Sequence, residues 1–172
     1  MLIDDFMPGY DFCETHDIKI SAKAENVYRV LNEIDLCDSA IIRWLFRLRG
    51  LPTSGMKLRE MRKMGFETLG AKENEEVLLG LAGKFWTLTG NLRKVDADNF
   101  REFDEKGFAK ATWNFSLEET NGKTLLTTET RIKCLDAESR KSFGFYWTLI
   151  QPFSGLIRKE MLKTIKKKAE SS

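Results

Sequence analysis

The sequence predicts an α+β domain in which a seven-stranded, twisted antiparallel sheet wraps around one long C-terminal helix. Residues 10–20 alternate apolar and polar side chains, as a strand with one buried face does. From residue 66 onward, turn signals divide the chain into short strand-like runs, and Asn121–Gly122 is the strongest of these signals. Residues 136–168 carry apolar side chains every three or four positions, which is typical of an amphipathic helix. With 172 residues and no internal repeat, the chain is expected to be one domain spanning residues 1–172.

Two short helices are predicted after the first strand. Residues 24–34 have apolar side chains at helical spacing. Residues 39–49 form the second helix, with Ser39 as the N-cap and Gly50 just past the C-terminus. Residues 51–65 contain Pro52 and are polar and irregular, so we expect a loop outside the core.

Six further strands complete the predicted sheet as successive antiparallel hairpins. Tight turns are expected at Asn74, near residues 97–99 and at Asn121–Gly122. In residues 109–117 the odd positions are apolar and the even ones polar, which fixes the buried face of that strand. The six strands are predicted at residues 66–73, 76–83, 88–96, 99–103, 108–119 and 124–135.

The last helix is predicted to begin after an Asp136 cap and to be bent at Pro152. A proline inside a helix removes a backbone donor and costs about 3 kcal/mol. We interpret the bend as the feature that lets the helix follow a curved sheet, with Ser154 and Gly155 leaving space beneath it. The stripe that faces the sheet is expected to contain Phe143, Trp147, Ile150, Ser154, Ile157, Met161 and Ile165.

Three stretches give the chain a family resemblance: residues 10–31 (YDFCETHDIKISAKAENVYRVL), 78–86 (LLGLAGKFW) and 146–162 (YWTLIQPFSGLIRKEML). Together with the element order, they resemble a sub-group of the START-related, polyketide cyclase-like helix-grip superfamily (SRPBCC) over residues 9–168. That superfamily includes lipid-transfer proteins, plant hormone and allergen carriers, aromatase/cyclases and dehydratases. The resemblance implies an apolar cavity between the sheet and the long helix, and it supplies no catalytic residues.

Composition and motifs exclude several classes of function. The 28 basic and 26 acidic residues leave a net charge of +2, too small to indicate nucleic-acid binding. Glycine-rich phosphate loops, hydrolase elbows and zinc-protease motifs are absent, and one histidine cannot build a multi-histidine metal site. We therefore expect no cofactor and no metal.

Features of the chain also predict its compartment. Cys13, Cys37 and Cys134 are odd in number and widely spread, which favours free thiols in a reducing compartment. The N-terminal residues show no signal peptide, and the longest nearly apolar run, 15 residues, is short for a membrane span. A cytoplasmic location is the expectation.

Glu14 and His16 are unusual because they lie on the apolar parity of the first strand. Two residues apart on one face, their side chains lie about 7 Å apart and point the same way. They can form a structural pair with neighbouring Thr or Arg side chains, anchor the polar end of a ligand, or act as an acid/base pair. The last strand is expected beside the first, so Thr128 and Thr130 should be their neighbours.

Aromatic side chains are the candidate walls of the cavity, because each buries a large, rigid surface. Trp113 on the sheet and Trp147 on the helix are expected to face each other across the interior. The full set of predicted ligand-binding residues is Glu14, His16, Trp44, Phe85, Trp86, Trp113, Phe115, Thr128, Thr130, Phe143, Trp147, Ile150 and Ser154.

Two basic segments have a second interpretation. Arg158, Lys159 and the lysines at 163–168 are a solvated helix end or a patch for transient contact with a membrane surface. Residues 41–65 are basic and amphipathic and are expected near the cavity entrance, as a lid or partner-binding segment.

The function these observations favour is a carrier or sensor that binds a hydrophobic or amphipathic small molecule or lipid internally. Two alternatives remain at this point. One is a cyclase or dehydratase in which His16 is the base and Glu14 orients it. The other is a protein-interaction module with a filled interior.

Overall fold

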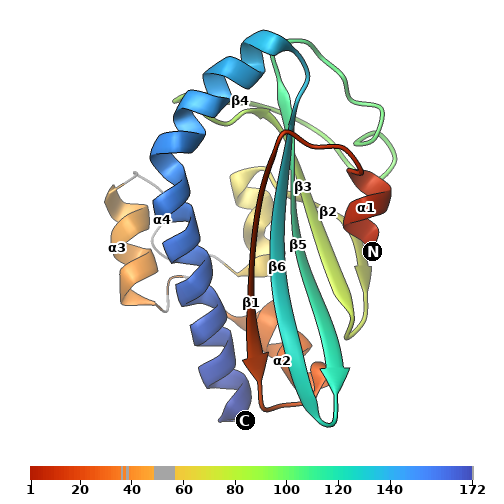
Figure 1. Ribbon diagram of the computed structural model, residues 1–172, viewed down its shortest axis with the longest axis vertical. Helices are drawn as coiled ribbons and strands as arrows, with labels where there is room; N and C mark the ends of the chain where they lie inside the picture. Colours follow the sequence, from red (N-terminus) through yellow and green to blue (C-terminus); the bar gives the residue numbers. More distant parts are fainter. Residues whose placement is uncertain (36, 38, 49–56, 172) are drawn as a thin grey trace.

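The computed structural model describes residues 1–35, 37, 39–48 and 57–171. The sheet lies on one side of a long C-terminal helix, and the shorter helices pack around both (Figure 1). The elements in chain order are α1 (Leu2–Phe6), β1 (Phe12–Ile20), α2 (Ala24–Glu33), α3 (Ala40–Leu48), a 3₁₀ helix (Leu58–Met64), β2 (Glu67–Lys72), β3 (Glu76–Lys84), β4 (Gly90–Arg93), β5 (Ala109–Thr120), β6 (Lys123–Cys134) and α4 (Ala137–Glu170).

Within these residues the sheet has six antiparallel strands in the order β1-β6-β5-β3-β2, and β4 pairs with β3. The predicted hairpin at Asn121–Gly122 is confirmed: both residues have positive φ, 53° and 72°, and Thr120 pairs with Lys123 across the turn. The first and last strands are neighbours, as predicted, with Glu14 opposite Thr130 and His16 opposite Thr128.

The prediction of seven strands is wrong at residues 99–103, the fifth predicted strand, which form no strand. The Asp96 carboxylate accepts hydrogen bonds from the backbone N–H groups of Asp98 and Asn99, at 3.1 and 3.0 Å. The Phe100 N–H donates to the Asp96 carbonyl at 3.0 Å, which closes a helical turn. Such local side-chain bonds compete with strand pairing. Phe100 is fully buried because the turn inserts it under the sheet, not because it belongs to a strand.

The N-terminal segment and the loop before β2 both contribute more to the core than expected. Helix α1 was not predicted, and it buries Ile3 and Phe6 against the sheet face that points away from α4. The predicted loop forms the 3₁₀ helix, which buries Leu58 and Met61 in the main core. Gly50 and Pro52, the expected helix end and loop proline, lie outside the described residues.

Helix α4 begins where the sequence predicts. The Asp136 carboxylate accepts the N–H of Ser139 at 2.7 Å, and the Ser139 hydroxyl accepts the N–H of Asp136 at 3.2 Å, forming a capping box. The helix then continues through Pro152 to Glu170. It bends as it passes along the sheet (Figure 1), as an internal proline allows.

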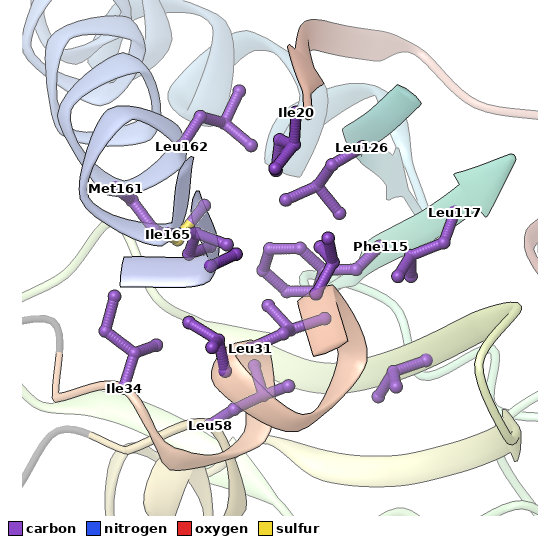
Figure 2. Close-up of a cluster of buried hydrophobic side chains, with 14 of the residues drawn as sticks. Ile20, Leu31, Ile34, Leu58, Phe115, Leu117, Leu126, Met161, Leu162 and Ile165 are labelled. Carbon is purple, nitrogen blue, oxygen red and sulfur yellow. The ribbon is translucent and has the colours of Figure 1, made fainter. Parts of the chain in front are cut away.

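The main core fills the space beneath the C-terminal half of α4. Helix α2 closes this end, and its buried side chains meet those of β1, β5, β6 and α4 (Figure 2). The residues drawn there include Ile20, Leu31, Ile34, Phe115, Leu126, Met161, Leu162 and Ile165. On α4 the fully buried members of this core run from Met161 to Ala169, so the core lies beneath the C-terminal end of the helix.

Candidate ligand-binding site

A cavity of about 400 Å³, partly open to the surface, lies beneath residues 143–158 of α4. Its roof is α4, its floor is the face of β3, β5 and β6 that points toward the helix, and its rim is the 3₁₀ helix and the turn between β3 and β4. The volume falls within the usual range for small-molecule sites, about 300–1,000 Å³. The residues that line it are mostly apolar: Met61, Met64, Phe66, Leu81, Phe85, Leu88, Leu92, Ala111, Trp113, Ile132, Phe143, Tyr146, Ile150 and Ile157, with Thr87, Thr89, Gly90, Thr130, Ser154 and Arg158.

The floor follows from strand register. Trp113 pairs with Thr130, and Ala111 pairs with Ile132, so these side chains form two rows across β5 and β6 on one face. The indole Nε1–H of Trp113 donates to the Thr128 hydroxyl at 2.8 Å. Phe66 and Phe115 pack against the same indole, with ring centroids 5.9 and 5.1 Å away. These contacts hold Trp113 in one orientation at the cavity wall.

A polar corner interrupts the apolar lining where α4 crosses β6 and β1. Arg158 is the central residue: its side chain is only 12% exposed, and its Nη2–H donates to the Thr130 hydroxyl at 2.6 Å. The guanidinium carbon lies 5.0 Å from the centre of the Trp113 ring, a cation–π contact. The Arg158 Nε lies 3.6 Å from the Glu14 carboxylate, and this buried N–H has no hydrogen-bond partner among the residues described.

Glu14 holds the other side of this corner from β1. One carboxylate oxygen is 2.9 Å from His16 Nε2, and the other accepts the Ser154 hydroxyl at 2.9 Å. A Cβ added at Gly155 would lie 2.9 Å from the first of these oxygens. From the sequence, Gly155 was expected to leave space beneath the helix. That expectation is wrong, because the Glu14–His16 pair occupies the space.

Burial also changes the pKa of the Arg158 side chain. Removal from water lowers the pKa of the Arg158 guanidinium from its usual value, and the nearby Glu14 carboxylate acts in the opposite direction. Arginine titrates far above neutral pH, so the group keeps its charge. The result is a buried, oppositely charged pair at the edge of an apolar cavity.

Six of the predicted ligand-binding residues line the cavity: Phe85, Trp113, Thr130, Phe143, Ile150 and Ser154. Three others support it from behind, because Thr128 and Phe115 hold Trp113 and Glu14 pairs with Arg158. His16 faces Glu14 and a shallow surface groove beside Pro152 and Gly155.

The remaining aromatic candidates lie elsewhere. Trp147 stacks on Phe143, with centroids 5.7 Å apart, and contacts Phe12, so it packs on the β1 side of α4 instead of lining the cavity opposite Trp113. Trp86 packs on Phe85 and Phe143, outside the lining. Trp44 on α3 is 62% exposed, since the buried face of that helix is occupied by Ile42.

From the sequence, Arg158 was grouped with the lysines of a solvated helix end or membrane-contact patch and was not predicted to bind a ligand. The structure separates it from those lysines, because its side chain is only 12% exposed and lines the cavity. One signal was present: Arg158 lies four residues after Ser154, so both belong to the inward stripe of α4. In the part of the chain that the structure covers, no three His, Cys, Asp or Glu side chains gather as a metal site. None of its helices is long and apolar enough to cross a bilayer.

Comparisons with known proteins give similarity to solved structures alone. No protein-family model and no curated protein matches the chain. Protein MLL2253 from Mesorhizobium loti is 14% identical with a TM-score of 0.45, covering 90% of this chain and 96% of its own. CalU16 from Micromonospora echinospora is 13% identical with a TM-score of 0.33, covering 92% and 84%. TTHA0849 from Thermus thermophilus is 12% identical with a TM-score of 0.31, covering 93% and 95%. At these values the likenesses assign neither a family nor a function.

Proposed function

We propose that the protein binds a hydrophobic or amphipathic small molecule in this cavity, as a carrier or sensor. The observation that carries the proposal is the cavity of about 400 Å³ with an apolar lining and one polar corner at Thr130, Ser154 and Arg158. Ligand sites typically combine apolar walls with a few convergent polar groups. The resemblance to the helix-grip superfamily supports the same function, because its carriers hold ligands between sheet and helix.

The two alternatives have less support. An acid/base role for His16 requires reach to the substrate, and His16 is bonded to Glu14 and is not among the lining residues. An interaction module with a filled interior does not need a ligand-sized space beneath α4, and such a space lies beneath residues 143–158 of that helix.

Native mass spectrometry of the purified protein, followed by organic extraction, tests the proposal. Ile150 lines the cavity, whereas the neighbouring Leu149 is 59% exposed and is not among the lining residues. Ile150→Trp should therefore fill the cavity and reduce loading with a co-purifying or added apolar compound, whereas Leu149→Trp should load like the wild type. Equal loading of the two variants would refute the proposed function. So would wild-type protein that binds no apolar compound, either co-purified or added.

A further inference from the structure

The polar corner contains a charge pair that is already balanced. Arg158 contributes one positive charge and Glu14 one negative charge, and the side chains are only 12% and 8% exposed. Ser154 and Thr130, the polar groups that bond this pair at the cavity, are uncharged, and His16 bonds Glu14 from the surface groove outside the lining. Any further charge brought into the cavity would therefore have no partner of opposite sign.

The same corner has unused hydrogen-bond donors. A guanidinium carries five N–H groups and accepts no hydrogen bond. Arg158 donates to Thr130, while its Nε–H is buried without a partner among the described residues. The Trp113 ring stacks on the group and Arg158 lines the cavity, so a ligand oxygen can approach the guanidinium from the cavity side. An acceptor placed there gains a charge-assisted hydrogen bond.

We infer that the cavity selects ligands whose polar end is an uncharged acceptor, such as a ketone, ester or alcohol oxygen, over carboxylates of the same length. This inference rests on the proposed function and adds the chemical class of the ligand. A neutral acceptor bonds Arg158 and leaves the corner neutral. A carboxylate leaves one negative charge buried without compensation, which is costly in an apolar surrounding.

The test compares three ligands of one chain length: decan-2-one, decan-1-ol and decanoate. Affinity is measured by displacement of a fluorescent apolar probe at about pH 8, where decanoate is ionised. The wild type should bind the ketone and the alcohol roughly tenfold or more tighter than decanoate.

Glu14→Gln should reverse this preference. The amide keeps an oxygen and an N–H for Ser154 and His16 but removes the negative charge, so Arg158 becomes an unpaired cation and decanoate becomes the tightest ligand. Glu160→Gln is the matched control, because Glu160 is on α4 and pairs with Lys163 at 2.8 Å, away from the lining. It changes the net charge equally and should keep the wild-type order.

The outcomes separate the two proposals. Tighter binding of decanoate by the wild type, or an unchanged order in Glu14→Gln, overturns the inference while the proposed function stands. Failure of the wild type to bind the fluorescent probe and all three compounds overturns both.

A separate surface carries a second inference. The outward side of α4 has four exposed large apolar side chains at helical spacing, Phe145, Leu149, Phe153 and Leu156. Phe145 is 74% exposed and Leu149 59%. We call these four residues the α4 stripe. Isolated exposed apolar residues are normal, but a contiguous row marks an interaction site.

Lysines extend the α4 stripe in both directions. Lys141 lies one turn before Phe145, and Lys159, Lys163 and Lys167 follow Leu156 on the same side of the helix; all four are exposed. Glu160 pairs with Lys163 and compensates its charge in part. An apolar row between basic residues is the pattern of a helix that lies in a membrane interface.

We propose that the α4 stripe docks on an anionic membrane surface. Charge favours a membrane over a second copy of the chain. Glu138 and Glu160 lie on the same side of α4, so four lysines against two carboxylates leave that side with a net positive charge. Association of two copies through this side would bring two net positive surfaces together, which opposes association. Anionic lipid headgroups complement the lysines while the apolar row enters the interface.

Sedimentation with vesicles tests this proposal. The wild type should sediment with vesicles of phosphatidylcholine and phosphatidylglycerol and be released by salt, and it should stay in solution with phosphatidylcholine alone. Lys159→Gln with Lys167→Gln should weaken binding about thirtyfold, because each lysine near an anionic surface contributes roughly fivefold. Lys72→Gln with Lys123→Gln removes two exposed lysines from distant turns and should bind like the wild type.

A second pair of variants tests how much the apolar residues of the α4 stripe contribute to vesicle binding. Phe153 and Tyr10 are both 46% exposed, and Tyr10 lies beside Arg131 on the other face of the sheet. Phe153→Ser should lose vesicle binding, and Tyr10→Ser should keep it. The membrane proposal would be overturned if the wild type did not bind anionic vesicles. It would also be overturned if light scattering showed that the wild type is a dimer and that Phe153→Ser is a monomer.

Discussion

Gly155 shows how one missing side chain sets the distance between α4 and β1. The helix approaches β1 so closely there that a Cβ would meet the Glu14 carboxylate at 2.9 Å. That carboxylate cannot swing away freely, because its two oxygens bond His16 and Ser154. Gly144, two to three turns earlier in the same helix, has room: an added Cβ would lie 3.5 Å from the nearest atom of Phe12, an ordinary contact.

The two glycines should therefore respond in opposite directions to alanine. Gly144→Ala should raise the free energy of unfolding by about 0.5–1 kcal/mol, the usual gain in a helix interior. Gly155→Ala should lower it, because displacement of Glu14 outweighs that gain. Urea denaturation of both variants measures the difference. A comparable gain in both would show that Glu14 is not held by its partners.

The sequence predicts which face of an element a residue lies on, but not whether a charged residue on that face is buried. Arg158 illustrates the difference. Alternation in residues 10–20 placed Glu14 and His16 on the inner face of β1, and the structure confirms that placement. The spacing of four residues from Ser154 places Arg158 on the inward stripe of α4, but no local signal shows that its charged end is buried. Its burial depends on Trp113 and Thr130, which are distant in sequence and meet it only in the folded chain. Trp44 is the converse case, an aromatic side chain that the fold leaves exposed.

At the scale of elements, the N-terminus of α4 is held by Asp136. Its carboxylate accepts the backbone N–H groups of Ser139 and Gly107, so it ties the helix to the loop before β5. The hydrogen bond from the Ser139 backbone, followed by the one from its hydroxyl, holds the Asp136 pKa below its usual value. A depressed pKa stabilises the fold above the unfolded-state pKa of about 3.9, and that stability is lost as the pH falls through the folded-state pKa.

Asp136→Asn should therefore be less stable than the wild type at neutral pH, and the gap should close below about pH 4. Asparagine is itself a good N-cap, so the variant isolates the contribution of the charge. Denaturation midpoints across a pH series measure the gap. Asp98→Asn, at an exposed turn outside the cap, is the control and should show no such convergence.

Elements with a strong local signal were the predictable ones. The capping residue and apolar stripe predicted α4, and Asn121–Gly122 predicted the β5–β6 hairpin. The segment at residues 99–103 was predicted to be a strand because turn chemistry at residues 97–99 separates it from the strand predicted before it. Hydrogen bonds around Asp96 decide its conformation instead. Helix α1 is five residues long, too short for a periodic pattern, and depends on packing against the sheet.

At the scale of the whole molecule, the interior is divided along α4. The core around Phe115 and Ile165 packs beneath the C-terminal end of α4, and the cavity lies beneath residues 143–158. Sequence predicted a cavity between sheet and helix, but it could not locate it, because the division depends on where α2 and the 3₁₀ helix pack. The Glu14–Arg158 pair lies near the boundary between these regions.

This division has a consequence for how the protein responds to compression. Unfolding eliminates internal space, and the volume change on unfolding scales with the space eliminated. Hydrostatic pressure should therefore unfold this chain readily. A compound that occupies the cavity should move the pressure midpoint upward, and Ile150→Trp should reproduce that shift with no compound added. Intrinsic fluorescence in a high-pressure cell measures the unfolding midpoint of the protein with the compound and of Ile150→Trp. If neither the compound nor the substitution changes the midpoint, the cavity makes no contribution to the volume change on unfolding.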